Sequence, residues 1–123
     1  MFEIEFGNLS FDIETSEQLL CVIVGGKSEV SSLNEFIFKA LDYLEKSDRF
    51  FDEVTEYRKC IFADALKYDV KWLYEIFEGM KRKVSFNIGE TMKVLTGNIT
   101  VFDNVWAVET EDLFYYIHWC TTA

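Results

Sequence analysis

The sequence predicts an α+β domain: an N-terminal hairpin and strand join a C-terminal four-strand meander in one antiparallel sheet, with three central helices packed on it. Alternating apolar residues or short apolar runs, both typical of strands, fill residues 1–26 and 91–120. Between them, apolar residues recur at intervals of three and four, the spacing of helices that bury one face. No repeat or linker divides the 123 residues, so we expect a single domain over 1–123.

The first two strands are expected to form a hairpin. Apolar residues alternate with glutamates over 2–6, and a Gly-Asn pair at 7–8 offers a two-residue turn into a second strand over 9–13. In this register one face is apolar, and the other face carries Glu3, Glu5, Asp12 and Glu14. Because Glu3 would lie opposite Asp12, the carboxylates repel one another unless solvent or a basic partner relieves them.

The next segments predict a buried strand and a helix. The continuous apolar run 19–24 is typical of a strand buried on both faces, and Gly25 and Gly26 are expected to end it in a loop. A helix should follow Ser32, which forms a capping box with Glu35. Its inward residues, at helical spacing, are Leu33, Phe36, Ile37, Ala40, Leu41 and Leu44.

Two more helices and a meander complete the expected fold. The helices cover about 50–66 and about 70–80, the second one capped by Asp69. The four strands of the meander are expected at 91–96, 99–102, 105–109 and 113–120, with turns at 97–98 and 103–104.

The expected register of the meander separates two faces. One face holds Met92, Val94, Ile99, Val101, Trp106, Val108, Leu113, Tyr115, Ile117 and Trp119. The other face holds an aromatic group with Phe102, Phe114, Tyr116 and His118. These side chains are either exposed anchors of a protein interface or core residues under a helix, and the sequence leaves both open.

The negative charge lies at the two ends of the chain. Segments 1–26 and 94–123 contain five and four carboxylates and no Lys or Arg, whereas 27–93 is nearly neutral and the total is −10. This charge repels nucleic acid and anionic membranes, so a charged partner should be basic. A membrane helix needs about 18 uninterrupted apolar residues, and no segment approaches this. Three widely separated cysteines suit a reducing compartment, so we expect a cytoplasmic protein.

No motif of a catalytic, cofactor or metal site is present. His118 and Cys120 share a strand face, but a reactive thiolate needs electropositive surroundings and this end of the chain is acidic. One histidine and three scattered cysteines supply no close pair of metal ligands. We therefore expect a protein that is not an enzyme and that holds neither a cofactor nor a metal.

In its small α+β size, acidic surface and aromatic candidates Phe114 and Tyr116, the chain resembles bacterial immunity proteins, the cytosolic inhibitors of polymorphic toxins such as those of contact-dependent growth inhibition. The resemblance implies a monomer or weak homodimer that binds a cognate toxin domain, often a basic nuclease, and occludes its active site. The expected partner-binding residues are Glu3, Glu5, Asp12, Glu14, Asp103, Glu109, Glu111, Asp112, Phe114, Tyr116 and His118.

Two other functions remain open at this point. A nucleic-acid mimic that inhibits another basic protein would carry its carboxylates in a track like that of phosphates. A small-molecule-binding α+β domain would instead have a pocket, for example one lined by Trp106, Tyr115 and Trp119.

Overall fold

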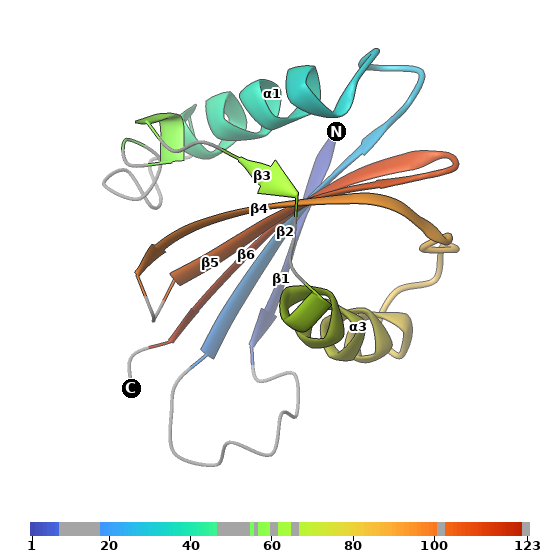
Figure 1. Ribbon diagram of the computed structural model, residues 1–123. Coiled ribbons are helices and arrows are strands. Elements are labelled where there is room, and N and C mark those ends of the chain that lie inside the picture. The colour runs from blue at the N-terminus through green and yellow to red at the C-terminus, as the bar shows by residue number, and fades with distance from the viewer. Residues whose placement is uncertain are drawn as a thin grey trace.

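The computed structural model describes residues 1–7, 18–46, 55, 57–59, 62–64, 67–100 and 103–121. Its elements, in chain order, are β1 (Phe2–Gly7), β2 (Gln18–Gly26), α1 (Leu33–Lys46), β3 (Ala63–Asp64), α3 (Lys67–Lys81), β4 (Thr91–Thr100), β5 (Asp103–Thr110) and β6 (Leu113–Thr121). The strands form one antiparallel sheet in the order β1-β2-β6-β5-β4-β3, with α1 on one face and α3 on the other (Figure 1). The predicted α+β class with an antiparallel sheet is confirmed.

The centre of the sheet is buried on both faces, as the apolar run in β2 predicts. Cys21 and Ile23 pack on the α1 side, whereas Val22 and Val24 pack on the α3 side. The strand is longer than expected, because Gly25 and Gly26 remain paired with β6. A Cβ atom on Gly25 would lie 2.7 Å from the Phe36 ring, so this glycine allows α1 to pack closely on the strand.

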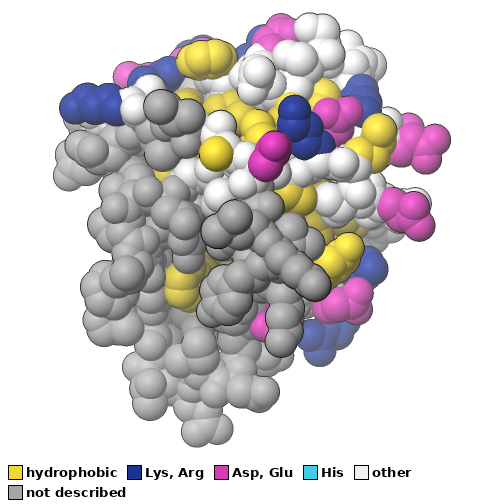
Figure 2. All heavy atoms as spheres, in the orientation of Figure 1, with side chains coloured by type: hydrophobic (Ala, Val, Ile, Leu, Met, Phe, Trp, Pro, Cys, Tyr) yellow, Lys and Arg dark blue, Asp and Glu magenta, His cyan; other side chains and the backbone are white. Residues whose placement is uncertain are grey.

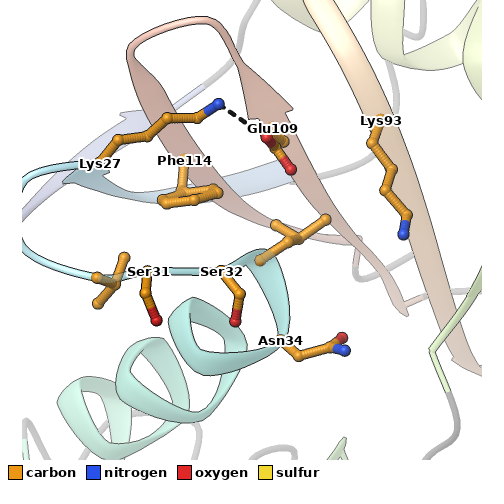
Figure 3. A pocket seen from close by; sticks show the side chains of 9 residues that line it. Lys27, Ser31, Ser32, Asn34, Lys93, Glu109 and Phe114 are labelled. Carbon is orange, nitrogen blue, oxygen red and sulfur yellow. Dashed lines mark hydrogen bonds and ion pairs between the residues drawn. The ribbon is translucent and has the colours of Figure 1, made fainter.

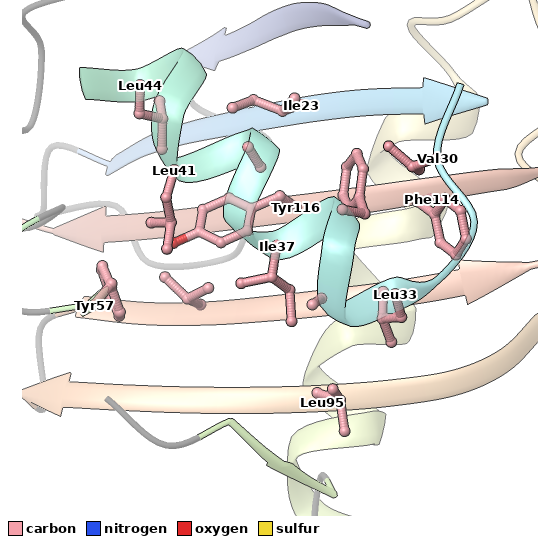
Figure 4. Close-up of a cluster of buried hydrophobic side chains, with 14 of the residues drawn as sticks. Ile23, Val30, Leu33, Ile37, Leu41, Leu44, Tyr57, Leu95, Phe114 and Tyr116 are labelled. Carbon is pink, nitrogen blue, oxygen red and sulfur yellow. The ribbon is translucent and has the colours of Figure 1, made fainter. Parts of the chain in front are cut away.

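Helix α1 covers its face of the sheet as predicted, and Figure 4 shows its apolar side chains above β2, β6 and β5. All six residues expected to face inward are buried. Half of the expected capping box forms, since the Glu35 N–H donates to Ser32 Oγ at 3.1 Å. The Glu35 carboxylate accepts instead from the N–H and hydroxyl of Ser31, and these bonds lower the pKa of Glu35.

The other two expected helices differ from the prediction. Helix α3 begins at Lys67, before Asp69, so Asp69 is not its cap. The helix expected over 50–66 cannot extend to 66, because β3 at 63–64 pairs with β4; residues 55 and 57–59 are helical. Pairing with a neighbouring strand, which no local pattern encodes, decides the conformation of residues 63–64.

The C-terminal meander has three strands rather than four. The expected turn at 97–98 is wrong, because β4 continues through it and absorbs an irregularity in register between Asn98 and Thr100. The expected turn at 103–104 is also wrong, because these residues begin β5. The predicted faces of β5 and β6 are nevertheless confirmed: Trp106 and Tyr115 lie on the α3 side, and Ala107 and Tyr116 on the α1 side.

Strand β1 forms one edge of the described sheet and pairs with β2, Phe2 lying opposite Val24. The expected partner strand over 9–13 lies outside the described residues. The expected alternation along β1 is present, since Ile4 packs on the α3 side and Glu3 accepts a hydrogen bond from Cys21 Sγ on the α1 side. No described helix is both long enough and apolar enough to cross a membrane.

Candidate functional site

The expected partner-binding carboxylates do not form one cluster. Glu109, Glu111 and Asp112 lie at the β5–β6 turn, and Asp103 lies at the opposite end of β5, roughly 24 Å away at about 3.4 Å per residue. Glu3 and Glu5 lie on β1, at an edge of the sheet. Two further expected residues, Asp12 and Glu14, lie outside the described part of the chain.

Of the two alternatives left open for the aromatic group, the core alternative holds for three of its members, so their assignment as partner-binding residues is wrong. Phe114, Tyr116 and His118 are 2%, 1% and 2% exposed because α1 and the helical residues 57–59 cover this face. The Phe114 ring stacks on Phe36 at 5.4 Å, and His118 contacts Tyr57 edge-on at 5.6 Å. Their role is therefore packing in the core, and Phe102 lies outside the described residues.

A cavity of about 440 Å³ opens between the N-terminus of α1 and the sheet (Figure 3). Glu109 points into it and accepts a hydrogen bond from the Lys27 ammonium at 2.7 Å, and both side chains of this ion pair are about two-thirds to three-quarters buried. The Lys27 ammonium also lies 5.7 Å from the centre of the Phe114 ring, and Lys93 flanks Glu109 from β4. Glu109 is thus neutralised within the molecule. The sequence reasoning missed this because Lys27 is 82 residues away.

At the same end of the sheet, the exposed Glu29 pairs with the N-terminal ammonium of Met1 at 2.7 Å, whereas Glu90, Glu111 and Asp112 are exposed without such a partner; we call these three residues the acidic end. Thr91 pairs with Thr110, so Glu90 and Glu111 each lie next to a residue of the last pair between β4 and β5. No cation of the described chain lies within ion-pairing distance of these three groups. In Figure 2, acidic side chains project along the right-hand edge, where the β5–β6 turn lies in Figure 1.

Hydrogen bonds fix the β5–β6 turn, which carries Glu111 and Asp112, two members of the acidic end. The Thr110 hydroxyl donates to the Leu113 carbonyl at 3.0 Å and accepts from the Leu113 N–H at 3.1 Å. The Lys27 N–H donates to the Asp112 carbonyl at 3.1 Å, which ties the turn to the end of β2. The carboxylates therefore sit on backbone that is already ordered in the free protein, which reduces the entropy lost on binding.

Beside the acidic end, a second hollow of about 310 Å³ lies between α3 and the start of β4. Its lining residues are Tyr74, Phe77, Glu78, Lys81, Ile88, Gly89, Glu90 and Thr91. Tyr74, which is 59% exposed, was not expected at a site. Helical spacing could have indicated it, because positions 74, 78 and 81 form a stripe beside the buried residues 73, 76, 77 and 80.

The residues expected to mark a ligand pocket are part of the core. Trp106, Tyr115 and Trp119 pack under α3, and none of them lines either cavity. No cluster of three or more potential metal ligands occurs among the residues that the structure describes. No protein-family model, curated protein or solved structure matches this chain.

Proposed function

We propose that this chain is an immunity protein that binds a cognate toxin domain, a basic nuclease, and neutralises it by occluding its active site. The observation that carries the proposal is the acidic end, where Glu90, Glu111 and Asp112 are exposed, close together and without a described cationic partner. Nuclease active sites carry Lys and Arg to hold phosphates, so a rigid group of carboxylates is complementary to them.

The charge distribution of the free protein also favours this assignment. Glu90 and Glu111 flank the last pair of β4 and β5, Thr91 with Thr110, and like charges that lie near each other repel. A basic partner would convert this repulsion into attraction. The net charge of −10 would also steer a cationic domain toward the surface before contact.

Charge-reversal variants test the surface. Glu111→Lys and Asp112→Lys together should slow association with the toxin domain by about tenfold at low salt, since charges at an interface rim act mainly on the association rate. The matched control for each single reversal, Glu111→Lys or Asp112→Lys, is Asp64→Lys, which changes the net charge equally at an exposed carboxylate of the edge strand β3. Unchanged association in the double variant would remove the acidic end from the interface.

A rescue experiment tests the function itself. The C-terminal domain encoded by the neighbouring upstream reading frame is expressed in a heterologous bacterium, with and without this chain, and surviving cells are counted. Killing that this chain reverses, and that the double variant reverses less well, is the expected result. A neighbour that is harmless, or that kills whether or not this chain is present, would contradict the proposal.

A further inference from the structure

The hollow between α3 and the start of β4 combines apolar walls with carboxylates at its rim. Phe77 and Ile88 are buried in the wall, and Tyr74 is the exposed ring beside them. Glu78 and Glu90 contribute the two carboxylates, from α3 and from the segment before β4. An apolar wall that ends in carboxylates fits a long side chain with an aliphatic stem and a cationic head.

The charges already present leave part of this site unsatisfied. Lys81 lines the hollow and pairs with Glu78 at 3.0 Å, with both side chains more than half exposed. No described cation pairs with Glu90. The hollow can therefore accept one further cation at Glu90, and a second cation would compete with Lys81 for Glu78.

The hollow is continuous with the acidic end. Gly89 approaches Thr110 closely, since a Cβ atom on it would lie 3.2 Å from the Thr110 Cβ, and Glu90 belongs to both groups. A partner seated on Glu111 and Asp112 would thus place its neighbouring side chains over the hollow. In protein interfaces, pockets that receive arginine or aromatic side chains contribute much of the binding energy.

We infer that this hollow receives an arginine side chain of the basic partner, its guanidinium between Glu90 and Glu78 and its plane against the Tyr74 ring. Arginine suits the site better than lysine, because its planar head both stacks on aromatic rings and bonds carboxylates in pairs. The inference rests on the proposed function for the identity of the partner, but the site can be tested without the toxin.

The test is a titration of the isotope-labelled protein with the tripeptide amide Gly-Arg-Gly, followed by backbone amide NMR shifts. Saturable shifts are expected at residues 88–91 and around Tyr74. The amide of Gly-norleucine-Gly, which keeps the aliphatic stem and the N-terminal ammonium but lacks the guanidinium, is the matched control and should produce none. Shifts spread evenly over all exposed carboxylates, without saturation, would overturn the inference.

Single substitutions at the hollow should change the affinity for Gly-Arg-Gly in opposite directions. Glu90→Gln should weaken Gly-Arg-Gly binding about fivefold, as expected for an exposed ion pair, and Tyr74→Ala should weaken it by a factor of about two to five. Lys81→Met should strengthen binding, because it frees Glu78 from its internal partner. Asp64→Asn should change nothing. An affinity that is the same in Glu90→Gln and Lys81→Met as in the parent would overturn the inference.

Because the titration contains no toxin, its outcome does not depend on whether the proposed function is correct. Binding of the peptide together with failed rescue in cells would reject the immunity function and retain a site for a cationic side chain. Successful rescue without peptide binding would retain the function and reject the arginine site.

Discussion

At the scale of single residues, neighbours rather than residue type decide which carboxylates are available to a partner. Glu109 and Glu111 are two positions apart, yet Glu109 is paired with Lys27 inside a cavity and Glu111 is exposed at the turn. Glu35 is likewise engaged, by the N–H and hydroxyl of Ser31. The free charge of the described surface is therefore smaller and more localised than the sequence indicates.

Because of Tyr115, the free energy of unfolding should decrease when the pH becomes alkaline. Its hydroxyl donates to the Ile88 carbonyl at 2.8 Å, and burial raises its pKa above the usual value of about 10. Since the folded state holds the proton more tightly, the stabilisation is complete below about pH 10 and is lost as the pH rises above that value.

The substitution Tyr115→Phe isolates this effect. At pH 7 it should lower the free energy of unfolding by about 1 kcal/mol through loss of the hydrogen bond. Above about pH 10 the difference in the free energy of unfolding between parent and variant should shrink. Tyr115 then ionises in the unfolded parent but stays protonated in the folded parent, which lowers the stability of the parent alone. Urea titrations at neutral and alkaline pH measure both values; a constant difference would show that Tyr115 does not titrate with folding.

Gly89 is required by its backbone conformation. Its φ is +86°, and a side chain would also approach Thr110, which closes the β5–β6 turn. We expect Gly89→Ala to lower the free energy of unfolding by at least about 1–2 kcal/mol, the cost of a left-handed conformation with a Cβ atom. Gly26→Ala is the comparison, because a Cβ atom there meets nothing closer than 3.4 Å. Equal effects of the two changes would contradict this explanation.

At the scale of elements, the parts that could be predicted are those whose pattern is local. Helix α1 carries a six-residue apolar stripe and an N-cap, so its start and its buried face are both encoded within 14 residues. The two faces of β5 and β6 follow from simple alternation. Pairing with β5 continues β4 through Gly97, where the local Gly-Asn pair predicted a turn. Pairing with β4 makes 63–64 a short strand, where the local pattern predicted a helix.

Two phenylalanines on α1 test its predicted face directly. Phe36 is fully buried and stacks on Phe114, so Phe36→Ala should lower the free energy of unfolding by about 3–5 kcal/mol. Phe38 lies on the same helix but is 63% exposed, so Phe38→Ala should change the free energy of unfolding by no more than about 0.5 kcal/mol. Chemical denaturation of both variants gives the comparison, and similar losses would contradict the described face of α1.

At the scale of the whole molecule, the sequence correctly indicated that the excess negative charge of the described residues lies on or beside one sheet. It did not indicate that the carboxylates lie at separate places on that sheet. Charge counts along a chain do not say which end of a strand a residue occupies, so Asp103 and Glu111 were grouped although β5 separates them. Charge counts also do not show that helices cover both faces of the sheet. Because both faces are covered, the aromatic residues of β6 belong to the core. Three of the expected residues, Glu109, Glu111 and Asp112, do lie together at the β5–β6 turn.

The net charge should also make the free protein more stable in salt. With a formal charge of −10, self-repulsion opposes the compact state, and added salt screens it. Urea midpoints should therefore rise between about 10 mM and about 0.5 M NaCl. Replacing Glu90 and Glu111 together by Gln should reduce the rise, since this removes two exposed negative charges that flank the same strand pair and have no described cationic partner. A midpoint that falls with added NaCl would indicate that attractive ion pairs outweigh the repulsion.

Two neighbouring inner strands of the sheet, β2 and β6, join segments that are far apart in the chain, since Leu20 lies opposite Trp119. During synthesis on the ribosome, β2 is complete long before β6 exists, and its apolar residues have no neighbour on that side. Long-range pairing of this kind slows folding and leaves strand edges open to other chains. We therefore expect the nascent protein to depend on chaperones until its last strand has emerged.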